Sequence, residues 1–145
     1  MNNPTHRFDQ INESDREKAS NSYLMSVIFI TFALPLPIVN LIATFVFGVA
    51  NRRSSNFVKW HCTQALLSQF SLFVINSVAF AWTVLLLFHV FTISNGFIGY
   101  VLTIIAFNIW EFLATVIAAI QTRKGVHYRW FFYGDLTDAL QKPTP

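Results

Sequence analysis

The side chain best placed for chemistry in this chain is Glu111, the only charged residue between Lys59 and Arg123. On a helix rising about 1.5 Å per residue it would lie roughly 18 Å from Arg123. If Arg123 marks a membrane surface, Glu111 lies near the middle of the bilayer. An ionisable group at that depth costs several kcal/mol unless it is paired, neutral or in contact with water, so it indicates a functional site by default.

Polar residues recur around Glu111 at helical spacing. Asn108, Glu111 and Thr115 follow one another at intervals of three and four residues, which places them on one face of a helix. The preceding apolar segment offers a matching face, and Asn76 lies on its edge at about the depth of Asn108. The residues that share this face are His61, Gln64, Ser68, Ser71 and Ile75. Membrane helices pack and form hydrogen bonds through such faces. We therefore predict a candidate intramembrane polar site that consists of Asn76, Asn108, Glu111 and Thr115.

Three interpretations of Glu111 remain open at this point. No Lys or Arg is available inside the membrane, so loss of solvent favours the protonated, neutral acid. The acid could then form a hydrogen bond to Asn76 or another side-chain oxygen and join two helices. Alternatively, it could line a water-filled transport path, or contact a partner subunit.

The remaining reactive side chains do not predict an enzyme. His61 and Cys62 are adjacent, so on a helix they point about 100° apart and form no nucleophile–base pair. Together with His127 they lack the spacing of a zinc site. The chain has no glycine-rich phosphate loop and no H-E-x-x-H motif. We predict no catalytic residue, no cofactor and no bound metal.

Two long stretches that must position these residues contain no Asp, Glu, Lys or Arg. They run from residue 19 to 51 and from 60 to 110, and both are rich in Phe, Ile, Leu and Val. A soluble domain of 145 residues exposes too much of its surface to hide so much apolar area. A bilayer can hide it, because about 20 apolar residues span the hydrocarbon core. The sequence thus predicts an all-α, polytopic membrane protein.

The chain divides into three predicted regions. A polar N-terminal segment occupies residues 1–21, where Ser14 could begin a short interfacial helix. The membrane domain occupies residues 22–124, and an aromatic and basic interfacial tail occupies residues 125–145. The membrane helices are expected at about 22–34, 37–51, 57–91 and 97–122.

Proline and glycine signals set these boundaries. Pro35 and Pro37 interrupt the first apolar run, which is either two short half-helices or one kinked span. Ser94–Gly96 is a turn signal between the two long helices. Gly125 is placed like a glycine at a helix C-terminus.

The charges predict an orientation. Residues 51–60 contain Arg52, Arg53 and Lys59 without an acid, and the tail is also basic. A hairpin of the two long helices puts both clusters on one side, in agreement with the positive-inside rule. We expect both termini in the cytoplasm, a bacterial inner-membrane location and no binding of nucleic acid.

Two short segments carry a resemblance to a known family. The run Ser54–Leu66 and the ending Lys124–Arg129 resemble the Tic-twenty-like superfamily, which comprises channel-associated subunits of the chloroplast inner-envelope translocon and small bacterial relatives. The resemblance implies a four-helix bundle in which residues 22–50 form two half-helices. It also implies that seven residues seat the helix ends at the membrane interface: Phe57, Trp60, His61, Gln64, Ala65, Gly125 and Tyr128.

Two functions are consistent with these features. The first is a non-enzymatic membrane scaffold or accessory subunit, and the resemblance implies help in protein insertion or translocation. The alternative is a small channel or transporter that uses the polar stripe around Glu111. The expected partners are the lipid bilayer and either other membrane subunits or further copies of the chain.

Overall fold

The computed structural model of the protein describes residues 11–32, 37–90 and 92–141. Within these residues the chain is all-α, as the sequence predicted. It forms five helices, α1 (Glu13–Phe32), α2 (Pro37–Ala50), α3 (Asn56–Leu87), α4 (Asn95–Arg123) and α5 (Tyr133–Leu140).

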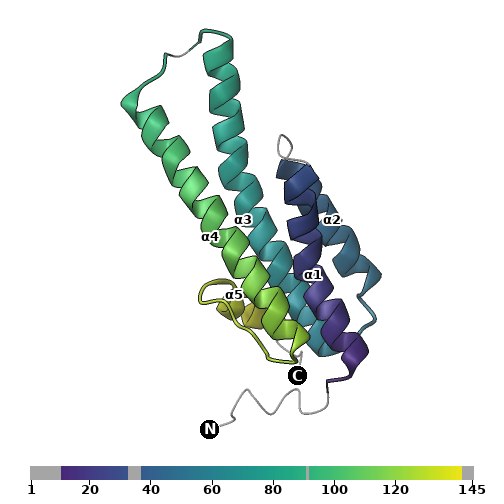
Figure 1. The fold of residues 1–145 in the computed structure, drawn as a ribbon. Helices are drawn as coiled ribbons and strands as arrows, with labels where there is room; N and C mark the ends of the chain where they lie inside the picture. Colours follow the sequence, from purple (N-terminus) through teal and green to yellow (C-terminus); the bar gives the residue numbers. More distant parts are fainter. Residues whose placement is uncertain (1–10, 33–36, 91, 142–145) are drawn as a thin grey trace.

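The two longest helices form a hairpin and are the elements suited to a bilayer. α3 has 32 residues and α4 has 29, and both are long and apolar enough to cross a membrane. Each begins at a serine cap, because Ser55 accepts a hydrogen bond from Val58 N and Ser94 accepts one from Phe97 N. α1 and α2 pack beside only part of this hairpin, and its tip extends past them (Figure 1).

The first helix differs from the prediction. α1 begins at Glu13 rather than near residue 22, so the polar residues and the first apolar residues share one helix. Its polar part packs against the end of α4, where the Ser20 hydroxyl donates to the Ala119 carbonyl over 2.9 Å. Ala19 is fully buried on another side of α1, where it packs with Phe57, Val58 and Cys62 of α3. The segment therefore does not lie apart as an interfacial helix.

The first apolar run folds as two helices rather than one kinked span. α1 ends at Phe32 and α2 begins at Pro37, where a proline is tolerated because the first helical N–H has no partner within the helix. The two helices run antiparallel and side by side (Figure 1). Pro35, the other predicted breaker, lies outside the described residues.

The hairpin tip also differs from the prediction. α3 ends at Leu87 instead of residue 91, and His89 adopts a left-handed backbone with φ of 56°. The predicted turn residues Ser94 and Asn95 begin α4 instead, with Ser94 as the cap. At the other end of α4, Gly125 has φ of 82° and its N–H bonds to the Thr122 carbonyl, so the predicted C-terminal glycine is confirmed.

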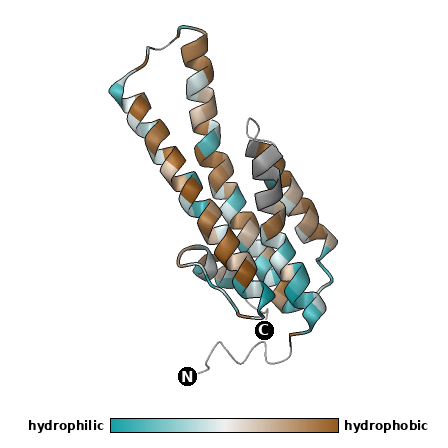
Figure 2. Ribbon diagram, in the orientation of Figure 1, coloured by the Kyte–Doolittle hydropathy of each residue, from teal (hydrophilic) through white to brown (hydrophobic). Residues whose placement is uncertain are grey.

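Charged and polar residues gather at one end of the molecule. The start of α1, the loop between α2 and α3, and α5 all lie at this end, which we call the base (Figure 1). Figure 2 shows hydrophilic residues concentrated there, while most of α3 and α4 is hydrophobic. Large apolar side chains stay exposed along the hairpin, among them Phe70, Val74, Leu102, Ile105 and Ile109. This is the pattern of a surface that faces lipid.

Candidate functional site

Glu111 lies between α3 and α4, as its spacing predicted, but its partner differs from the one named from the sequence. The side chain is only 3% exposed. The Ser68 hydroxyl of α3 donates a hydrogen bond to its Oε1 atom. Asn76 therefore does not bond to Glu111. The acid joins the two helices through a serine one layer closer to the base.

Asn76 and Asn108 instead form a reciprocal pair. Asn76 Nδ2 donates to Asn108 Oδ1 over 3.1 Å, and Asn108 Nδ2 donates to Asn76 Oδ1 over 2.9 Å. Asn108 Nδ2 also bonds to the Ile104 carbonyl over 2.8 Å. Both side chains are half-buried, and each satisfies the other in an apolar setting. The predicted polar site therefore consists of two separate layers of hydrogen bonds.

The rest of the stripe forms the buried face of α4. Thr115 is 2% exposed one turn after Glu111, and Ala118 and Thr122 continue the same face. This face packs against α1 as well as α3. α1 was not part of the predicted site, because its polar start was expected to lie outside the membrane domain.

A groove of about 720 Å³ reaches Glu111 from the base. Its walls come from α3, α4 and the segment before α5, and they include Ser71, Trp110 and Tyr133. Burial raises the pKa of Tyr133, so its hydroxyl stays neutral. Arg129 also lines the groove, but its guanidinium forms ion pairs of 2.7 Å with both Asp135 and Asp138. The groove thus combines an apolar aromatic lining with one carboxyl group in its wall.

The family-motif residues lie together in a second polar cluster at the base. Gln64 is fully buried, and its Nε2 atom donates to the Tyr23 hydroxyl over 2.9 Å and to the Tyr128 carbonyl over 3.3 Å. Its Oε1 atom accepts from Trp130 N over 3.2 Å. His61 Nδ1 lies 2.8 Å from the same Tyr23 hydroxyl. We call these residues the Gln64 network, and it joins α1, α3 and the segment before α5.

Aromatic rings surround His61 beside this network. Its ring centroid lies 4.5 Å from that of Phe57, 5.0 Å from Trp60 and 5.2 Å from His127. Burial lowers the pKa of His127 to about 4, so this imidazole is neutral at pH 7. Within the described residues no set of three His, Cys, Asp or Glu side chains could bind a metal ion.

Of the other motif residues, Ala65 packs in the core and Gly125 ends α4. Ala65 is buried in the cluster that contains Tyr23 and Trp130. A Cβ atom on Gly125 would lie 2.8 Å from Arg16 Nε, so the glycine allows α1 to approach the end of α4. Ala65 is thus buried and Gly125 is half-buried.

Sequence reasoning did not include several members of this base cluster. Tyr23 connects Gln64 and His61, and Asp138 accepts a hydrogen bond of 2.7 Å from Trp60 Nε1. Tyr23 is the one ionisable side chain in the first apolar run, and that is the signal that could have identified it. Asp138 lies in the polar tail, where no spacing distinguishes it from a solvated acid.

Comparison with protein families gives one match, over residues 18–136, to the model of the magnetosome magnetite crystal formation protein family, MamF/MmsF. No curated protein and no solved structure matches the chain. The resemblance to the Tic-twenty-like superfamily is therefore wrong, and the translocation role that it implied loses its support. An aromatic and basic run suits the interface end of a membrane helix in any family, so a motif of this kind does not separate one family from another.

Proposed function

The chain belongs to the magnetosome magnetite crystal formation protein family, and from this membership we propose that it is a non-enzymatic accessory subunit of the magnetosome membrane. In this role it assists magnetite crystal formation as a structural component, alone in several copies or with other membrane subunits. The observation that supports the proposal most directly is the match over residues 18–136, which includes both membrane-length helices.

The structure supports a structural role more than a catalytic one. The polar groups of the Gln64 network bond to one another and to backbone atoms, which leaves the base rigidly joined. The long hairpin exposes apolar side chains along its length, which suits contacts with lipid or with apolar helices of other subunits. No described group of acids and histidines forms a metal site that could process iron.

The orientation in the membrane is part of the proposal. The base contains Arg52, Arg53 and Lys59, and the positive-inside rule supports a cytoplasmic side for it. The tip at residues 88–94 then faces the magnetosome lumen. Its sequence contains no Asp or Glu, so we expect it not to bind mineral through carboxylates.

Cysteine labelling tests this orientation. In a Cys62→Ser background, Arg53→Cys should react with a membrane-impermeant reagent only when the reagent has access to the cytoplasmic side of the membrane. Ile93→Cys should not react with reagent on the cytoplasmic side. Reaction of both positions from the same side would contradict the hairpin orientation.

Deletion and complementation test the function itself. In a magnetosome-forming bacterium the tagged chain should purify with the magnetosome membrane, and its deletion should change the size or shape of the crystals in electron micrographs. The intact chain should restore them. Normal crystals after deletion, in cells without a second copy of the gene, would refute a role in crystal formation.

A second candidate function is a small channel or transporter. The observation that favours it is the groove that Glu111 helps to line, because a carboxyl group in the wall of such a groove could bind a proton or a cation. Proteoliposomes that contain the purified chain should then conduct ions, and Glu111→Gln should abolish the flux without loss of stability. Absence of flux with a stable protein would leave the structural role.

A further inference from the structure

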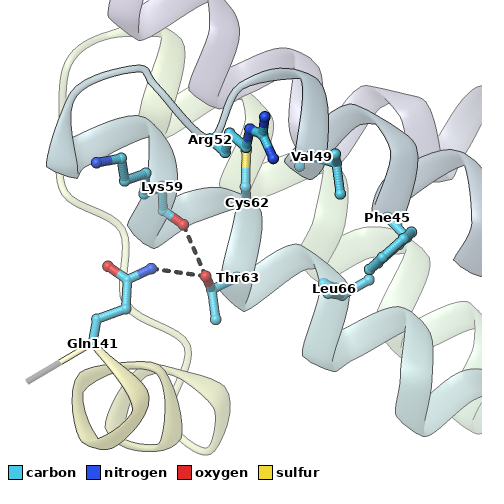
Figure 3. A pocket seen from close by; sticks show the side chains of 9 residues that line it. Phe45, Val49, Arg52, Lys59, Cys62, Thr63, Leu66 and Gln141 are labelled. Atoms are coloured by element: carbon cyan, nitrogen blue, oxygen red, sulfur yellow. Dashed lines mark hydrogen bonds between the residues drawn. The ribbon is translucent and has the colours of Figure 1, made fainter.

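A second groove lies between α2 and α3 where both helices meet the loop that joins them. It has a volume of about 380 Å³. Figure 3 shows Phe45 of α2 beside Leu66 of α3 towards one end of the groove and Lys59 towards the other, with Arg52 beside Cys62 between them. Arg52 and Phe45 are seven positions apart, as are Lys59 and Leu66, so the basic and apolar ends are separated by roughly 10 Å along the helices.

The basic end has no acidic neighbour in the lining. The residues that line the groove include Arg52 and Lys59 but no Asp or Glu. The acids that form ion pairs in the described chain do so elsewhere, Glu17 with Arg123, and Asp135 and Asp138 with Arg129. Two cations without a counter-charge favour an anionic ligand.

Two other polar side chains in the wall, those of Thr63 and Gln141, bond to each other. The Thr63 hydroxyl donates to the Lys59 carbonyl over 3.0 Å and accepts a hydrogen bond of 2.7 Å from Gln141 Nε2 (Figure 3). These bonds leave the charged ends of Arg52 and Lys59 as the groups available to a ligand. A guanidinium matches the geometry of a phosphate, and an ammonium adds a point charge.

The apolar end suits a hydrocarbon chain. Phe45 and Val49 are 55% and 46% exposed, so they form an open wall that faces lipid rather than a packed core. Gly48 lies between them on α2, and a Cβ atom there would only just contact Cys62, at 3.9 Å. The missing side chain leaves the space along α2 that an acyl chain would fill.

We propose that this groove binds one anionic phospholipid of the surrounding bilayer. Its phosphate lies at Arg52 and Lys59, and the first part of one acyl chain runs past Gly48 towards Phe45 and Leu66. Basic pockets between membrane helices are known to select anionic headgroups in this way. The site gives the protein a preference for membranes, or regions of a membrane, with negative lipid.

Lipid binding to the full purified chain tests the proposal. Native mass spectrometry in detergent should show one tightly retained phosphatidylglycerol, and phosphatidylcholine with the same acyl chains should bind much more weakly. The variant Arg52→Gln with Lys59→Gln should lower the affinity for phosphatidylglycerol on the order of 30-fold, since each basic side chain near an anionic headgroup contributes about a fivefold effect. Removal of two other basic groups at the base, by Lys18→Gln with Lys124→Gln, should change the affinity for phosphatidylglycerol by less than about threefold.

A substitution that leaves the charges unchanged tests whether the apolar end of the groove binds an acyl chain. Gly48→Leu fills the apolar end and keeps both cations, so it should also weaken phosphatidylglycerol binding while the helix content stays constant. Competition by inorganic phosphate at the same concentration as the lipid would show a phosphate site and overturn the lipid assignment. Equal binding of the two phospholipids, or equal losses in the Lys18 and Lys124 control, would overturn the proposal as well.

Discussion

Replacing Gln64 with leucine should destabilise the protein by about 3 kcal/mol, because one side chain joins three parts of the chain. The amide donates to the Tyr23 hydroxyl and the Tyr128 carbonyl, and it accepts from Trp130 N. Each bond contributes about 1 kcal/mol net, and a buried N–H left without a partner costs about 1 to 3 kcal/mol. Leucine has a similar volume and recovers part of this cost through apolar contacts.

The assay should separate local from global effects. Unfolding of the purified protein by SDS, followed by circular dichroism, gives the change in free energy. Hydrogen exchange then measures the protection of backbone amides in the segment before α5. The Trp130 amide should lose its protection in Gln64→Leu. Gln121→Leu is the matched control, since that side chain lies on α4 outside the Gln64 network, and it should leave the Trp130 amide protected.

Two results together would refute the reasoning. If Gln64→Leu changes the unfolding free energy by less than about 0.5 kcal/mol and the Trp130 amide keeps its protection, Gln64 does not position the C-terminal segment. The buried network would then be a consequence of packing by the neighbouring rings.

Further predictions concern single residues elsewhere in the fold. Glu111→Leu should cost about 0.6 to 2 kcal/mol through loss of the bond from Ser68, while Glu111→Gln should remain close to the native stability, and equal thermal unfolding of the two variants would contradict the helix-joining role. Gly125→Ala should cost about 1 to 2 kcal/mol because φ is 82°, whereas Gly99→Ala, which meets nothing within 4 Å, should cost nothing in the same SDS titration. The pKa of His127 is about 4 in the folded protein and about 6.5 in the unfolded chain, so the unfolded chain binds the proton more readily. The contribution of His127 to stability is therefore complete above pH 6.5 and declines as the pH falls towards 4. His127→Gln should flatten the profile of unfolding free energy against pH in that range.

The broad fold could be predicted from the sequence because a bilayer demands long apolar stretches. The charge-free run from residue 60 to 110, with the turn signal at Ser94–Gly96 near its middle, predicts a helical hairpin almost independently of other contacts. The start of α1 could not be predicted in this way. Its first polar residues resemble a solvated segment, and Glu13, Ser14 and Glu17 do stay exposed, whereas Ala19 and Ser20 are buried where α1 packs against α3 and α4.

The site was predictable as a set of residues but not as a set of contacts. Spacing placed Glu111 and Asn108 on one face of α4, but Ser68 and Asn76 lie roughly 12 Å apart along α3. Which of them meets the acid depends on how far the two helices are shifted along each other, and the spacing within each helix does not predict that shift. The Gln64 network joins residues more than 60 positions apart, and no local pattern encodes such a contact.

The unequal ends of the molecule have a consequence for the membrane around it. At the base α1, α2 and α5 pack beside α3 and α4, whereas α3 and α4 alone among the described helices continue to the tip (Figure 1). In the proposed orientation the protein would therefore take up more area in the leaflet at its base than in the leaflet at its tip. Such a wedge fits best where the membrane bends with the base on its convex side, and a small vesicle whose outer leaflet surrounds the base provides that curvature. Many copies inserted in the same direction would favour the bending of a flat membrane into such a vesicle.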